Sequence, residues 1–160
     1  MRLKRARLRN FRCYQAETCV TFEDLTALVG RNDSGKSAVL DALGMFFGEY
    51  APDVDDASIH GDKNDMTIIC EFDELPDSVL IDADRGVSPA SEWLLNTAGN
   101  LEIQRVFNGA LQKPKLTRTV LIARHPTAAN YNDLLYLKNR DLKNRAEQLG
   151  VDLTAVDQRV

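Results

Sequence analysis

The chain has 160 residues, enough for one domain, and its 44% hydrophobic content is that of an ordinary globular protein. It contains no run of 18 apolar residues and no apolar signal sequence, so we expect no membrane span and a cytoplasmic location. The net charge of -4 argues against a protein that coats nucleic acid without sequence preference. The three cysteines lack CxxC spacing, which predicts reduced thiols rather than a zinc site.

The first 29 residues predict three strands. Residues 2–9 form a short basic strand, which we interpret as a solvated surface, with contact to phosphate as the alternative. Residues 17–22 predict a second strand after a connection at 10–16. Residues 25–29 are nearly all apolar, and such a run predicts a strand covered on both faces.

The rest of the chain predicts two helices and three more strands. A helix is predicted over 36–47, because Val39, Leu43 and Phe46 recur at helical spacing and Gly48 follows as a stop. Residues 50–65 are polar and acidic, so they predict a loop. Residues 66–72 predict a strand, 101–107 and 117–123 a hairpin, and 132–149 a second helix that begins near Asp133.

Residues 30–37 match the G-x-x-x-x-G-K-[ST] pattern at every fixed position. Glycines let the backbone turn its N–H groups toward phosphate oxygens, and the N-terminal end of the following helix attracts negative charge. Lys36 is predicted to reach the β- and γ-phosphates as the catalytic lysine, and the Ser37 hydroxyl to be a magnesium ligand. The predicted contacts with nucleotide are Gly30, Arg31, Asn32, Asp33, Ser34, Gly35, Lys36, Ser37 and Ala38. We therefore predict a nucleoside triphosphate site with Mg²⁺; a strand–turn–helix that matches by chance is the alternative.

Hydrolysis also needs a carboxylate that helps to hold the metal and a group that positions water. Two candidate strands carry acids, Glu71 within 68–74 and Asp82 at the end of 79–82. Both are better interpreted as ordinary strand or loop, because acids are abundant in this part of the chain. We therefore expect residues 1–160 to be the N-terminal part of a longer ATPase domain and to be incomplete for hydrolysis.

Residues 3–47 resemble the start of ABC-type ATPases of the SMC and RecF kind. The resemblance rests on a basic strand that leads into Asn10-Phe11-Arg12 and on the run from Leu25 through the P-loop to Leu43. The segment Asn32–Ser37 is most similar to the OLD (overcoming lysogenization defect) family, which includes the ATPase–nuclease subunit of Gabija-type antiphage systems.

The resemblance implies an α/β P-loop fold of the ABC/SMC type: an N-terminal lobe with a mixed sheet and an antiparallel sub-sheet. It implies ATP as the nucleotide, self-association through the ATPase domain, and DNA as a partner of the full-length protein. It also places Asn10, Phe11 and Arg12 near the nucleotide, with Arg12 as a phosphate or ribose contact; a buried Phe11 and a solvated Arg12 are the alternative.

The family's nuclease domain has no counterpart in this sequence, so no nuclease activity is expected from the chain itself. The alternatives are a RecF- or SMC-type DNA-repair ATPase and a nucleotide sensor or assembly module that does not hydrolyse ATP.

Overall fold

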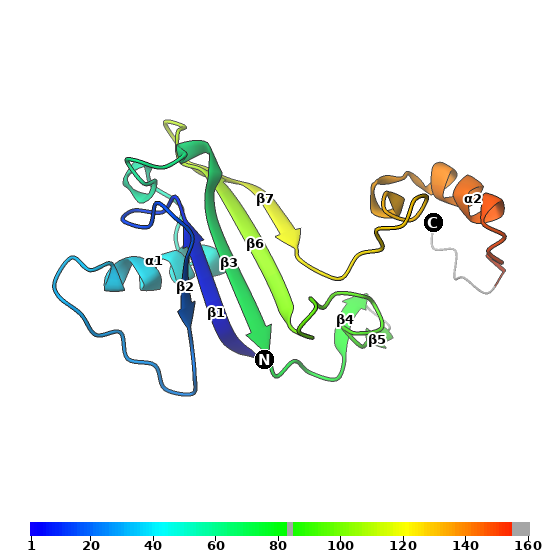
Figure 1. The fold of residues 1–160 in the computed structure, drawn as a ribbon, viewed down its shortest axis with the longest axis horizontal. Coiled ribbons are helices and arrows are strands. Elements are labelled where there is room, and N and C mark those ends of the chain that lie inside the picture. Colours follow the sequence, from blue (N-terminus) through cyan, green and yellow to red (C-terminus); the bar gives the residue numbers. More distant parts are fainter. Residues whose placement is uncertain (83–84, 155–160) are drawn as a thin grey trace. The chain divides into compact units, whose positions relative to one another are not determined.

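The computed structural model describes residues 1–82 and 85–154 (Figure 1). The chain divides into two compact units, Met1–Arg124 and His125–Val160, which we describe separately. Within the described residues, no helix is long and apolar enough to cross a membrane.

The first unit is built on a five-stranded sheet with the order β2-β1-β3-β6-β7, and every neighbouring pair is antiparallel. The strands are β1 (Arg2–Arg9), β2 (Thr18–Thr21), β3 (Met66–Asp73), β6 (Leu101–Asn108) and β7 (Lys115–Leu121). They confirm the five strands predicted around these positions and the hairpin of β6 with β7. A separate antiparallel pair, β4 (Val79–Asp82) and β5 (Arg85–Val87), lies between β3 and β6 in sequence.

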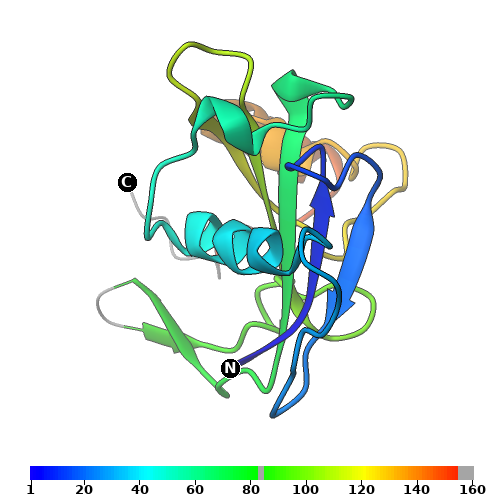
Figure 2. The ribbon, with the colours of Figure 1, turned by 90° about the vertical axis from the view of Figure 1, so that its left-hand side faces the viewer.

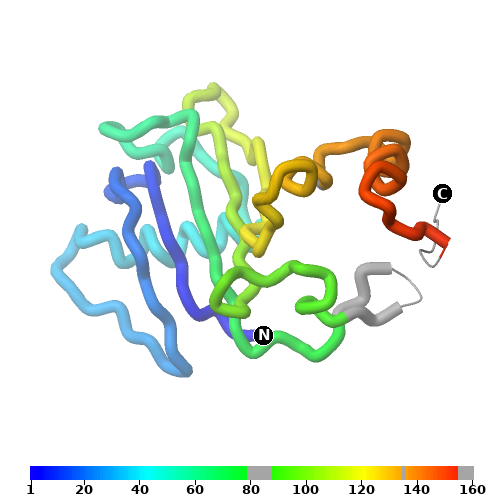
Figure 3. Tube along the Cα trace, turned by 45° about the vertical axis from the view of Figure 1, so that its right-hand side comes forward, coloured from blue at the N-terminus to red at the C-terminus, as the bar shows by residue number. Residues whose placement is uncertain are grey.

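Residues 25–29 do not form the predicted buried strand. All of 22–35 lacks helix and strand and runs as a long loop from β2 to the first helix (Figure 3). Leu25 and Val29 are 91% and 92% exposed. An apolar run becomes a buried strand only where other strands pair with it, and none does so among the described residues. The sheet is therefore wholly antiparallel there, rather than the expected mixed sheet.

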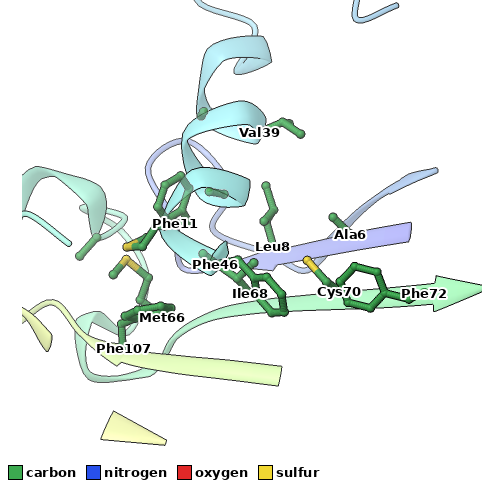
Figure 4. Packing of buried hydrophobic residues seen from close by; sticks show 14 residues of the cluster. Ala6, Leu8, Phe11, Val39, Phe46, Met66, Ile68, Cys70, Phe72 and Phe107 are labelled. Carbon is green, nitrogen blue, oxygen red and sulfur yellow. The ribbon is translucent and has the colours of Figure 1, made fainter. Parts of the chain in front are cut away.

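Helix α1 (Lys36–Phe47) has the predicted bounds and lies across one face of the sheet (Figure 2). It ends at Gly48, whose φ of 82° is in the left-handed region that glycine adopts readily. Val39, Met45 and Phe46 point from the helix into the core. The core residues labelled in Figure 4 are Ala6, Leu8, Phe11, Val39, Phe46, Met66, Ile68, Cys70, Phe72 and Phe107. Each large buried side chain stabilises the fold by about 1.5–3 kcal/mol, so this layer anchors α1.

The arginines of β1, interpreted as a solvated surface, are 30–42% exposed and form ion pairs with carboxylates. The pairs are Arg2 with Asp73, Arg5 with Glu71, Arg7 with Glu102 and Arg9 with Asp65. The acids come from the adjacent strand β3, from β6 beyond it and from the short turn before β3. This surface is therefore already occupied by carboxylates of the same chain.

Residues 50–65, predicted as a loop, contain two single 3-10 turns. They are η1 (Val54–Asp56) and η2 (Lys63–Asp65). In η1, the Asp53 side chain accepts a hydrogen bond from the N–H of Asp55, and Asp56 completes a capping box. These caps give a polar segment a defined shape.

The second unit contains two short helical segments in place of the single helix predicted over 132–149. They are η3 (Leu134–Tyr136) and α2 (Asn139–Gln148). Lys138 between them is extended, with φ −73° and ψ 157°, so the helix cannot continue through it. Arg145 of α2 joins the two segments, because it pairs with Asp133 at 3.0 Å and donates to the carbonyl of Asn130 at 2.7 Å.

Candidate functional site

The P-loop, residues 30–37, connects the long loop to the first turn of α1. Asp33 and Gly35 have φ values of 65° and 87°, so the backbone turns through two left-handed residues before the helix begins. Gly35 is the N-cap residue of α1, and Lys36 and Ser37 are its first helical residues. The side chains of Asn32, Asp33 and Ser34 are exposed. The motif therefore forms an exposed turn directly at a helix N-terminus.

Both motif glycines stand where a side chain would collide with a neighbour. A Cβ on Gly30 would lie 2.8 Å from the Ser34 Oγ. A Cβ on Gly35 would lie 2.7 Å from the Tyr14 hydroxyl oxygen and 2.8 Å from the Cys13 Sγ. The loop thus closes on itself at Gly30 and lies against the β1–β2 turn at Gly35, which explains why glycine occupies both positions.

Lys36 turns back across the loop. Its Nζ donates to the carbonyl oxygens of Gly30, at 2.9 Å, and Arg31, at 2.6 Å, and lies 3.4 Å from the Ser34 Oγ. The ammonium group is therefore inside the P-loop, held by neutral oxygen atoms. A phosphate oxygen would be a stronger acceptor than these carbonyls, because its negative charge adds a Coulomb attraction to the ammonium group.

A pocket of about 720 Å³ lies beside the P-loop. Its lining includes the polar motif residues Asn32, Lys36 and Ser37, together with Thr26, Leu28 and Leu40. This volume is within the range of small-molecule and cofactor sites, about 300–1,000 Å³. The lining offers both polar groups and apolar side chains.

The start of α1 supplies the donors that a polyphosphate needs. The N–H groups of Lys36, Ser37 and Ala38 are in the first turn, where a helix has no internal acceptor for them. The helix dipole adds the equivalent of about half a positive charge at this end. In the part of the chain that the structure describes, no hydrogen bond engages the exposed Ser37 hydroxyl, which leaves it free as an oxygen ligand. These residues fit a polyphosphate with Mg²⁺.

Asn10 and Phe11, predicted near the nucleotide, have structural contacts instead of contacts with the P-loop. Phe11 is fully buried in the core. The Asn10 side chain donates to the carbonyl of Asp65 at 2.9 Å and accepts from the N–H of Asp62 at 3.2 Å. Asn10 therefore fixes the segment around η2. Contact of either residue with nucleotide stays a prediction.

Arg12 joins three parts of the first unit. Its Nε donates to the buried Asp56 at 2.9 Å, its guanidinium pairs with Asp41 of α1, and its charge lies 5.3 Å from the ring centre of Phe11. It is thus partly exposed but held by two carboxylates, and it is not free for a phosphate in this arrangement. Contact between Arg12 and nucleotide stays a prediction, and it would require Arg12 to leave a carboxylate.

Glu71, one of the two candidate catalytic carboxylates, does not join the P-loop. Glu71 pairs in register with Arg5, and both side chains lie on the face of the sheet opposite the one that α1 covers. Burial alone would raise the pKa of Glu71, but hydrogen bonds from Asn100 and Asn96 and the charge of Arg5 outweigh it and lower the pKa. Glu71 is therefore the ionised centre of a structural network.

The side chain of Asp82 in β4 lies outside the described residues. Among the residues that are described, no group of three or more histidine, cysteine or acidic side chains is arranged to hold a metal ion.

Sequence reasoning missed Tyr14 and Cys13 as neighbours of the P-loop. The Tyr14 hydroxyl donates to the carbonyl of Gly35 at 3.1 Å. The two residues are 21 positions apart, and nothing in the residue pattern of 10–16 indicates this contact. Thr26, Leu28 and Leu40 were likewise not predicted as pocket residues.

The sequence matches the family model of the AAA ATPase domain over residues 1–158. No match is found among curated proteins.

Proposed function

Because the chain belongs to the AAA ATPase domain family, we propose that it binds ATP with Mg²⁺ through residues 30–38. Membership of the family makes this a nucleotide-binding ATPase domain. The single observation that carries the proposal is the position of the Lys36 ammonium group within the loop, next to the first N–H groups of α1.

Each part of the loop has a role in this proposal. The N–H groups of the first turn of α1 donate to phosphate oxygens, and Lys36 exchanges its two carbonyl partners for the terminal phosphate. The hydroxyl oxygen of Ser37 would be a ligand of Mg²⁺, and the metal would neutralise charge on the terminal phosphates. The apolar lining residues Leu28 and Leu40 give the less polar part of the nucleotide a surface to contact.

Lys36→Ala tests the site. Losing one charged hydrogen bond to phosphate costs about 1.5–3 kcal/mol, so the affinity for a non-hydrolysable ATP analogue with Mg²⁺ should fall by at least about tenfold in a calorimetric titration. Lys138→Ala is the control, because it removes the same charge from an exposed position in the second unit. Equal affinity of the Lys36 variant and the control would contradict the proposed site.

We further propose that residues 1–160 form the N-terminal part of an ABC-type ATPase domain like that of the OLD family. The resemblance of residues 3–47 supports this, and so does the exposure of Leu25 and Val29 in an apolar run that suits a buried strand. The wider proposal is an ATPase that acts on DNA in the cytoplasm, in antiphage defence, and that self-associates through this domain.

Two alternatives come from the same sequence: a RecF- or SMC-type repair ATPase, and a nucleotide sensor or assembly module without turnover. A phosphate-release assay with and without DNA separates them. In the whole protein, release that DNA accelerates supports an ATPase acting on DNA, whereas nucleotide binding without any release supports the sensor. Turnover by residues 1–160 alone would contradict our expectation that the catalytic carboxylates are supplied elsewhere.

A further inference from the structure

A tight turn follows β1 and presses against the P-loop. The N–H of Phe11 donates to the carbonyl of Tyr14 at 3.1 Å, and the N–H of Tyr14 donates back to the carbonyl of Phe11 at 2.7 Å. Phe11 is fully buried, so the base of the turn is fixed in the core. The Tyr14 ring is half-buried and packs against the same core. Tyr14 therefore projects from a rigid support.

The Tyr14 hydroxyl is bound to the first turn of α1. It donates to the carbonyl oxygen of Gly35 at 3.1 Å, and the same oxygen accepts the N–H of Val39 at 3.2 Å. Burial, and then the nearby Cys13, raise the pKa of Tyr14, so the hydroxyl keeps its proton at neutral pH. One carbonyl thus accepts a bond from its own helix and a second from a different element.

The direction of that carbonyl determines where the next amide points. In a trans peptide the C=O of Gly35 and the N–H of Lys36 lie in one plane and point in opposite directions, and the chain has no cis peptide among its described residues. While Tyr14 and Val39 hold the carbonyl, the Lys36 N–H points away from them, beyond the N-terminal end of α1. That is the side on which the P-loop would hold phosphate.

We propose that Tyr14 is a positioning residue for the phosphate site: its hydroxyl fixes the Gly35–Lys36 peptide so that the Lys36 N–H is already aimed at the phosphate. This inference rests on the proposed function. Gly35 adds a second observation, because a Cβ there would lie 2.7 Å from the Tyr14 hydroxyl oxygen. The tyrosine and the P-loop backbone therefore meet at a distance that only glycine allows.

Tyr14→Phe keeps the ring and removes the hydrogen bond. Losing one preorganising hydrogen bond should weaken Mg²⁺–ATP binding about three- to tenfold in calorimetric titrations of the full chain. The affinity for tripolyphosphate with Mg²⁺ should fall by the same factor, because Tyr14 acts on the phosphate site and not on the base. A loss confined to ATP would overturn the proposal.

Tyr50→Phe is a matched control. The Tyr50 hydroxyl also donates to a main-chain carbonyl of α1, that of Asp41, but at a point beyond the P-loop turn. Both variants lose a tyrosine–carbonyl bond to the same helix, so both should lower the melting temperature of the free protein. Only Tyr14→Phe should weaken triphosphate binding. An equal loss of affinity in both variants would mean that Tyr14 merely stabilises the helix, and it would overturn the proposal.

A measurement on the free protein separates this inference from the proposed function. In Tyr14→Phe, the amide NMR signals of Gly35 and Lys36 should shift, whereas those of β6 should stay unchanged. Unshifted signals would overturn the inference even if ATP binds normally. If the unchanged protein bound no triphosphate, the proposed function and the inference would both fall. If it bound ATP and Tyr14→Phe bound equally well, only the inference would fall.

Discussion

Gly35→Ala should lower the free energy of unfolding more than Gly48→Ala, the same change at the other end of α1. Alanine at a φ of 87° costs about 1–2 kcal/mol, because its Cβ approaches the following carbonyl oxygen. The new Cβ would also lie 2.7 Å from the Tyr14 hydroxyl and 2.8 Å from the Cys13 Sγ. Displacing the half-buried Tyr14 costs about 1–3 kcal/mol more. The expected loss in the free energy of unfolding is therefore about 2–5 kcal/mol.

Gly48→Ala isolates the conformational part of this cost. Gly48 ends the same helix with a φ of 82°, but a Cβ there would have no atom within 4 Å. Its replacement should cost only about 1–2 kcal/mol. The difference between the two variants then reports the collision of residue 35 with the β1–β2 turn.

Urea denaturation followed by circular dichroism measures both losses, and titration with an ATP analogue and Mg²⁺ measures the effect on binding. Gly35→Ala should bind weakly or not at all, whereas Gly48→Ala should bind like the unchanged protein. The reasoning is refuted if both alanine variants lose the same stability, or if Gly35→Ala retains full affinity.

Three further predictions concern the residues around the core. Arg12→Ala should lower the free energy of unfolding by about 2 kcal/mol, because it leaves the buried Asp56 without its cation. The partial exposure of Arg12 makes this loss smaller than the 3–5 kcal/mol of a fully buried pair. Urea denaturation that shows no loss of stability would contradict the contribution of this ion pair. Burial raises the pKa of Cys70 to about 12, so at pH 8 a thiol reagent should modify the two exposed cysteines at once and Cys70 only after unfolding. Glu71→Gln should destabilise the protein at pH 7 but less at pH 3.5. The pKa of Glu71 is lowered in the folded state, so the ionised carboxylate stabilises the fold above the ordinary pKa of about 4.3. This stabilisation is lost as the pH falls through the pKa of the folded state. A loss that is the same at both pH values would show that the charge of Glu71 does not contribute.

The elements that depend on local pattern could be predicted well. Helix α1 has the predicted bounds, because apolar residues at helical spacing and the terminal Gly48 are both properties of a short segment. The strands around 2–9 and 101–107 follow for a similar reason. The P-loop could be recognised because its glycines, lysine and serine act within eight consecutive residues.

Predictions failed where the partner of a segment decided its conformation. The apolar run at 25–29 indicated burial, but Leu25 is 91% exposed because no described strand pairs with it. The helix predicted over 132–149 is interrupted at Lys138, where the backbone is extended. The ion pairs of Arg12 could not be predicted either, because its two carboxylate partners lie 29 and 44 residues away in sequence. Contact of Arg12 with nucleotide stays a prediction.

What this sequence determined by itself is a phosphate-binding turn at the start of an amphipathic helix, since backbone freedom at glycine, the helix dipole and one lysine all act locally. What only the tertiary structure decided is what surrounds that turn: Tyr14 against Gly35, Arg12 between Asp41 and Asp56, and Glu71 on the far face of the sheet. These contacts join residues far apart in the chain, and their energies depend on distance and burial, which exist only after the strands have paired.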